Sequence, residues 1–165
     1  HTTRKKRGGS QDYYIFTSED DFKNKVSNSF FLEHALVHGN FYGTSKDFIE
    51  TKIAEEINII LEIDVQGVQQ IKSTSFPHES IFLLPPSINS LTERLNERGT
   101  NSKESIELRL SNAMREIPSC KNYDHILVND VFEDCCNDLA RIITGEDSFP
   151  MNSKKELFLT KLLNS

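Results

Sequence analysis

Residues 81–87 read IFLLPPS, an apolar run that stops at two prolines and a serine. Two other short apolar runs, residues 59–63 and 126–128, are also rich in β-branched residues and also end in polar side chains. Helical periodicity separates the three runs from one another. The pattern predicts three buried strands of a parallel sheet flanked by helices, an α/β fold. Ligands of such sheets bind at the carboxyl ends of the strands, where we expect the site.

Helix-start residues and apolar positions three or four residues apart predict the helices between and after these strands. They begin after Ser18 and after Ser87, and span approximately residues 45–56, 102–117, 133–144 and 153–163.

Composition excludes several classes of protein. The net charge of -6 argues against duplex nucleic acid as a partner. No apolar run approaches the roughly 18 residues of a membrane span, so we expect no membrane contact. The three cysteines, Cys120, Cys135 and Cys136, fit neither a disulfide framework nor a zinc site, because their number is odd and two are adjacent. They indicate a reducing, cytoplasmic compartment.

A series of short segments that covers nearly the whole chain resembles the guanylate kinase family in order and spacing. The segments are TTR at 2–4 with Arg7, Tyr14 before Phe16, FLE at 31–33, GNFYGT at 39–44, LEIDVQG at 61–67, PPS at 85–87, RL at 94–95, ERGT at 97–100, RL at 109–110 and VND at 128–130. Each segment alone is weak evidence for the family, whereas the whole set in this order and spacing is specific to it.

The resemblance implies a P-loop NTPase-like parallel sheet core with a small GMP-binding lobe and a helical lid. The core would comprise residues 1–3, 57–87 and 119–165, the lobe residues 4–56 and the lid residues 88–118. The implied activity is transfer of the γ-phosphoryl group of ATP to GMP. ATP and Mg²⁺ would be required, the metal arriving with ATP and without a dedicated set of protein ligands.

The family's phosphate-binding residues match Arg4, Arg7, Tyr14 and Tyr42. An arginine guanidinium can donate two parallel hydrogen bonds to one phosphate. The alternative interpretation of residues 4–7 is a run of charged side chains exposed to solvent. The turn between Arg7 and Tyr14 is shorter here than is usual in the family.

The family's guanine-reading residues match Glu33, Thr44 and Glu62. A carboxylate can accept both the N1–H and the exocyclic amino group of guanine, a donor pair that adenine lacks. The alternatives are structural: Glu33 as a carboxylate at a helix end or a strand edge, and Thr44 as a helix cap. Glu62 and Asp64 flank Ile63, so strand alternation places both carboxylates on one face. A structural ion pair remains an alternative for these two.

The resemblance places Asp64 near the phosphates and Mg²⁺ and assigns Arg94, Arg98 and Arg109 to neutralising charge on the transferred group. Solvated surface arginines are the alternative. Asn129 matches an adenine-contacting residue, or simply ends a strand in a turn.

No G-x-x-x-x-G-K-[ST] phosphate loop occurs in the sequence. In the family this loop precedes the Thr-Thr-Arg segment, and the chain starts at His1, so we expect a truncated N-terminus. The other readings are the peptide-binding guanylate-kinase-like module of scaffold proteins and a nucleoside monophosphate kinase of different specificity. The intact LEIDVQG segment and the lid arginines argue against the scaffold module. Glu33, Thr44 and Glu62 together argue against another specificity.

Overall fold

The computed structural model describes residues 1–6, 14–97 and 103–164. The chain forms two compact units, His1–His78 and Glu79–Ser165. The finer division into core, lobe and lid remains a prediction.

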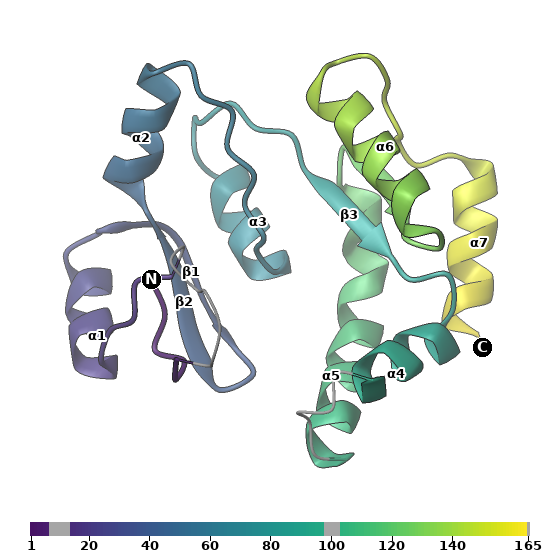
Figure 1. Ribbon diagram of the computed structural model, residues 1–165, viewed down its shortest axis with the longest axis horizontal. Helices are drawn as coiled ribbons and strands as arrows, with labels where there is room; N and C mark the ends of the chain where they lie inside the picture. The colour runs from purple at the N-terminus through teal and green to yellow at the C-terminus, as the bar shows by residue number, and fades with distance from the viewer. Residues whose placement is uncertain (7–13, 98–102, 165) are drawn as a thin grey trace. The chain divides into compact units, whose positions relative to one another are not determined.

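The first unit contains a β-hairpin and three helices in its described part. The Ser18 hydroxyl accepts a hydrogen bond from the Asp21 N–H (3.1 Å), and the Ser45 hydroxyl accepts one from the Phe48 N–H (3.4 Å). These side-chain caps confirm the two expected helix starts. The elements are α1 (Glu19–Ser27), β1 (Phe31–Val37), β2 (Asn40–Ser45), α2 (Lys46–Ala54) and α3 (Val65–Lys72), as Figure 1 shows.

A two-residue turn joins β1 and β2. His38 and Gly39 both have positive φ, 48° and 79°, and the flanking Val37 and Asn40 pair with each other. Positive φ at both positions is the type I′ geometry, whose twist matches that of the antiparallel strands. The hairpin was not among the expected elements, although a dipeptide ending in glycine between two apolar runs is a hairpin signal.

A β-bulge between Phe31 and Glu33 decides where their side chains point. The strand register shifts by one residue there, and Glu33 pairs with Thr44. The Phe31 ring covers the face of Gly43 and stacks on Phe22 of α1, with ring centroids 4.5 Å apart. Glu33 therefore shares the opposite face of the hairpin with Thr44, although residues two apart in a regular strand would share one face.

The expected strand at residues 59–63 is wrong. The segment is outside the regular elements, and the Ile60 side chain is 65% exposed. A run of apolar residues becomes a strand only when a neighbouring strand takes its backbone hydrogen bonds. The two strands in the described part of this unit, β1 and β2, pair with each other, so neither takes the backbone hydrogen bonds of residues 59–63.

The second unit is built on two parallel strands, β3 (Ile81–Leu84) and β4 (His125–Val128). Ile81 lies beside His125 and Leu84 beside Val128, so both remaining strands of the prediction are confirmed. Helices connect and follow the strands as expected of an α/β fold. They are α4 (Ile88–Glu97), α5 (Lys103–Glu116), the 3₁₀ helix η1 (Ile117–Asn122), α6 (Phe132–Ile143) and α7 (Ser153–Leu163).

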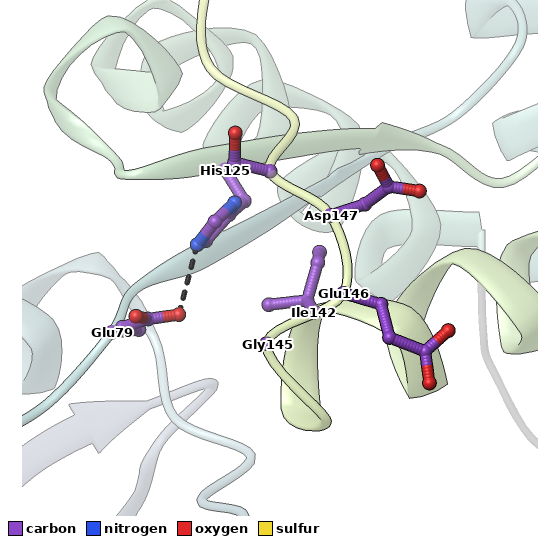
Figure 2. Close-up of a pocket in the computed structure, with 7 residues that line it drawn as sticks. Glu79, His125, Ile142, Gly145, Glu146 and Asp147 are labelled. Carbon is purple, nitrogen blue, oxygen red and sulfur yellow. Dashed lines mark hydrogen bonds and ion pairs between the residues drawn. The ribbon is translucent and has the colours of Figure 1, made fainter.

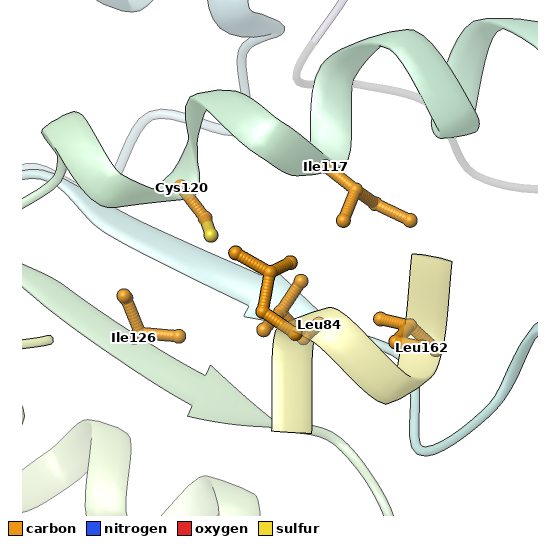
Figure 3. Packing of buried hydrophobic residues seen from close by; sticks show 6 residues of the cluster. Leu84, Ile117, Cys120, Ile126 and Leu162 are labelled. Carbon is orange, nitrogen blue, oxygen red and sulfur yellow. The ribbon is translucent and has the colours of Figure 1, made fainter. Parts of the chain in front are cut away.

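Both strands of the second unit bury side chains against η1 and α7. Leu84 and Ile126 are at most 1% exposed, and they pack with Ile117, Cys120 and Leu162 (Figure 3). Each fully buried aliphatic side chain contributes about 1.5–3 kcal/mol to stability. This cluster fixes α7 to the sheet. Among the helices of the described residues, none combines the length and the apolar character that crossing a membrane requires.

Candidate functional site

Glu33 is the most deeply buried carboxylate of the first unit's described part, 3% exposed. Its Oε1 accepts a hydrogen bond from the Thr44 hydroxyl at 2.5 Å. Its Oε2 lies against Gly67 of α3, so closely that a Cβ on residue 67 would be 2.6 Å from it. The hairpin and α3 thus hold one carboxylate between them.

The pKa of Glu33 is raised above its ordinary value of 4.5. Burial is the largest cause, because it disfavours the charged form. The Thr44 hydrogen bond opposes this shift, and the negative charge of Asp64 adds to it. A buried carboxylate of this kind accepts hydrogen bonds strongly from a ligand that presents two donors.

Tyr42 lies on the same strand face as Thr44, two residues away along β2. The Tyr14 ring packs edge-on against the Tyr42 ring, with centroids 6.3 Å apart, and the Arg4 guanidinium carbon lies 4.8 Å from the Tyr14 ring centroid. Backbone bridges from Thr2 to Phe16 and to Tyr42 bring these segments together. Arg4, Tyr14 and Tyr42 therefore form one cluster, while Arg7 lies outside the described residues, and the phosphate-binding role of all four remains a prediction.

Asp64 is the N-cap of α3. Its Oδ1 accepts from the Gly67 N–H and its Oδ2 from the Gln66 side-chain amide, both at 2.9 Å. The argument that strand alternation puts Asp64 and Glu62 on one face is wrong, because residues 59–63 form no strand. Glu62 is exposed. Within residues 1–6, 14–97 and 103–164, no three His, Cys, Asp or Glu side chains are grouped as metal ligands.

In the second unit, Arg94 of α4 binds the end of β4. Its Nη1 donates to the Asn129 carbonyl at 2.9 Å, and its Nη2 donates to the Asp130 carbonyl at 3.4 Å. Two predicted site residues, Arg94 and Asn129, are thus adjacent. Arg109 is half-buried on α5, and its Nε–H donates to no acceptor among the described residues. Arg98 lies outside the described residues.

A polar cavity of about 350 Å³ lies elsewhere in this unit, and none of its lining residues was predicted as a site residue. Figure 2 shows His125, whose Nε2 is 3.0 Å from the Glu79 carboxylate; its Nδ1 accepts from the Phe149 N–H at 3.1 Å. Both ring nitrogens are therefore engaged in holding residues 79 and 149 to β4. Glu146 and Asp147 complete the acidic rim.

Comparison with known proteins identifies the family. The sequence model of guanylate kinase matches residues 1–146. The chain belongs to the guanylate kinase family.

Curated guanylate kinases are similar over most of the chain. The protein of Hydrogenovibrio crunogenus is 45% identical over 143 residues, which cover 86% of this chain and 70% of the relative. The Escherichia coli K12 protein is 44% identical over 149 residues, or 88% of this chain and 72% of the relative. The crystal structure of guanylate kinase from Anaplasma phagocytophilum superposes with a TM-score of 0.73 at 29% identity, covering 98% of this chain and 82% of that one.

Membership in the guanylate kinase family makes this chain a nucleoside monophosphate kinase, a nucleotide-binding transferase with a P-loop NTPase-like α/β fold. ATP is the phosphate donor of the family. The resemblance found in the sequence is therefore confirmed, while the roles of individual residues remain predictions.

Sequence reasoning missed Gln70, which contacts β1 from α3. No local signal could have found it, because a glutamine on a helix surface does not reveal which backbone groups it meets. Gly67 belonged to the LEIDVQG segment, but its contact with Glu33 depends on how α3 packs.

Proposed function

We propose that this chain catalyses transfer of the γ-phosphoryl group of ATP to GMP, giving ADP and GDP. The observation that carries the proposal is the buried Glu33 carboxylate beside Thr44, with Arg4, Tyr14 and Tyr42 clustered nearby in the same unit. A base-reading end and a phosphate-binding end are what a purine monophosphate requires.

Glu33 selects guanine by accepting hydrogen bonds from N1–H and the exocyclic amino group. The burial that raises the pKa of Glu33 also excludes water that would compete for these bonds. The Thr44 hydroxyl, which donates to Glu33 in the absence of a base, turns to guanine O6 or N7 when the base occupies the carboxylate. The exposed Glu62 reaches the exocyclic amino group.

The phosphate of GMP binds to Arg4 and Arg7 and to the hydroxyls of Tyr14 and Tyr42. Guanidinium groups give bidentate, charge-assisted hydrogen bonds to phosphate oxygens. The packing of the Arg4 guanidinium on the Tyr14 ring supports this role, because a cation–π contact uses the face of the guanidinium and fixes the direction of its N–H edge.

Phosphoryl transfer relies on positioning and charge neutralisation and needs no covalent intermediate. Arg94, Arg98 and Arg109 supply positive charge from residues 88–118, which act as a lid over the core. Asn129 contacts the adenine of ATP. The two Arg94 hydrogen bonds to backbone carbonyls hold its guanidinium beside Asn129 and leave other N–H donors for phosphate.

Mg²⁺ bound together with ATP would neutralise charge on the β- and γ-phosphates. Asp64 fits a place near it, because its carboxylate is held by two donors and keeps free lone pairs.

The test of base recognition is calorimetric titration of residues 1–165 with GMP and with AMP. Glu33→Gln should weaken GMP binding by about 10- to 150-fold, the effect of a charge-assisted hydrogen bond of about 1.5–3 kcal/mol, and leave AMP nearly unchanged. Glu50→Gln is the matched control, because Glu50 is a half-exposed helix residue paired with Lys46. An equal loss for GMP and AMP would show that Glu33 supports the fold and does not read the base.

The test of catalysis compares two proteins. One is residues 1–165, and the other is the same chain preceded by the P-loop segment of the Escherichia coli relative. Both should bind GMP, and only the second should form GDP from ATP and GMP, because P-loop amides and lysine grip the donor phosphates. GDP formation at equal rates in both would refute the role given to that loop.

A further inference from the structure

The outer edge of β1 is engaged by one side chain of α3. Gln70 Oε1 accepts a hydrogen bond from the His34 N–H at 3.1 Å, and Gln70 Nε2 donates to the His34 carbonyl at 2.7 Å. Both backbone groups of a strand residue point to the same edge. The glutamine amide therefore occupies the place that a third strand would take, and it satisfies this part of the edge.

This contact adjoins the base-reading carboxylate in the chain. The His34 N–H belongs to the peptide group whose carbonyl carbon is that of Glu33, so the Gln70 amide holds the peptide plane next to the Glu33 α-carbon. The β-bulge, which turns the Glu33 side chain toward α3, immediately precedes this peptide. A bulge locally disrupts the hydrogen bonds between the two strands. The two hydrogen bonds from Gln70, made beside the bulge, hold the backbone there in one position.

The same helix also contacts the carboxylate directly. Gly67 and Gln70 are three residues apart, so they lie on one side of α3. Gly67 allows the helix to approach within contact of Glu33 Oε2, and Gln70 fixes how far along β1 the helix sits. Together they leave the Glu33 side chain little rotamer freedom before a ligand binds.

We propose that Gln70 is a positioning residue for guanine recognition, which presets the Glu33 carboxylate through its two hydrogen bonds to the His34 backbone. This inference rests on the proposed function of Glu33. Without the Gln70 amide, water can bond the His34 backbone groups, but α3 and the bulge can then shift. Glu33 would have to be ordered when the base binds, at the expense of affinity for guanine.

The test compares Gln70→Met with Gln69→Met. Methionine has a helix propensity close to that of glutamine and a similar length, so the first change removes the two hydrogen bonds to His34 together with a longer one from Gln70 Nε2 to the Gln66 carbonyl (3.3 Å). Gln69 is exposed on the same helix and serves as the control. We expect Gln70→Met to weaken GMP binding by about 5- to 10-fold, the effect of losing net hydrogen-bond free energy of about 1 kcal/mol or slightly more. AMP binding should stay within twofold, and Gln69→Met should change neither.

The selectivity ratio separates positioning from general stability. A Gln70→Met protein that keeps the wild-type ratio of GMP to AMP affinity, whether both affinities fall equally or neither changes, overturns the inference while the proposed function stands. A wild type that binds GMP no better than AMP overturns the proposed function, and this inference with it. If Gln70→Met does not fold, Gln70→Glu replaces it: this variant keeps an acceptor for the His34 N–H but opposes the carbonyl with a carboxylate. It should also lower the GMP-to-AMP ratio and speed hydrogen exchange of the His34 amide, and an unchanged ratio would again refute the role.

Discussion

Gly67→Ala should separate guanine recognition from stability. The new Cβ would lie 2.6 Å from Glu33 Oε2, whereas ordinary contact begins at 3.4 Å. It would also lie 3.2 Å from the Ile63 Cβ, which a few tenths of an ångström of movement relieves. The buried carboxylate or the helix must therefore move, and either movement breaks the arrangement of Glu33 with Thr44.

The two free-energy terms of folding partly cancel. Alanine stabilises a helix interior by about 0.5–1 kcal/mol relative to glycine, whereas overpacking a buried contact costs about 1–3 kcal/mol. The net loss is thus about 0–2.5 kcal/mol, or a few degrees in melting temperature. GMP binding loses the alignment of a charge-assisted hydrogen bond, so the dissociation constant should rise by about 10- to 150-fold.

A double-mutant cycle with Glu33→Ala identifies the cause. In the Glu33→Ala background no carboxylate meets the new methyl group, so Gly67→Ala should leave GMP binding unchanged and the melting temperature equal or higher. Titration calorimetry and thermal unfolding are measured on wild type, on each single variant and on the double variant. A Gly67→Ala protein that binds GMP like wild type, or one whose effect persists without the Glu33 carboxylate, would refute the contact as the cause.

Three further outcomes follow from the described contacts. Burial raises the pKa of Glu33, so ionising this carboxyl in the folded protein lowers the stability as the pH rises through the folded-state pKa. Glu33→Gln should therefore melt at a higher temperature than wild type at pH 7–8. The difference in melting temperature should vanish as the pH falls below 4.5, the ordinary pKa of the group. Asp64→Ala should lower the free energy of unfolding in urea by about 1 kcal/mol by removing the α3 cap, whereas Asp64→Asn keeps the cap. In the chain preceded by the P-loop segment, wild-type turnover in Asp64→Asn would refute a role near Mg²⁺. Cys136 is exposed, whereas burial raises the pKa of the Cys120 and Cys135 thiols. Ellman's reagent should therefore modify one thiol quickly in the native protein and all three after unfolding. Rapid modification of all three thiols in the native protein would contradict the burial of Cys120 and Cys135.

Several features of the chain could be predicted from its sequence, because they depend on interactions between residues close together in the sequence. Ser18 and Ser45 cap helices through hydrogen bonds that span three residues, so their neighbours along the chain suffice to predict them. The strands at residues 81–84 and 126–128 were predicted correctly, because each is a short apolar run whose side chains, Leu84 in one and Ile126 in the other, are buried in the core of the unit. The ordered family segments indicate the guanylate kinase family from the sequence alone, and the family comparison confirms it.

Other features depended on contacts between residues far apart in the sequence. Residues 59–63 have the composition of a buried strand but pair with no strand among the described residues of their unit. Composition indicates a tendency toward burial and does not say which segment will lie alongside. The side on which Glu33 points was set by a one-residue bulge, because strand alternation reverses with each inserted residue.

The sequence determined the family, the helices with local caps and the candidate chemistry of Glu33. Only the tertiary structure placed the Gln70 amide on the His34 backbone and the Arg94 guanidinium on the Asn129 carbonyl. Such side-chain to backbone contacts join groups about 35 residues apart. No periodicity encodes them, because they arise only when the packing of whole elements has fixed where each backbone group points.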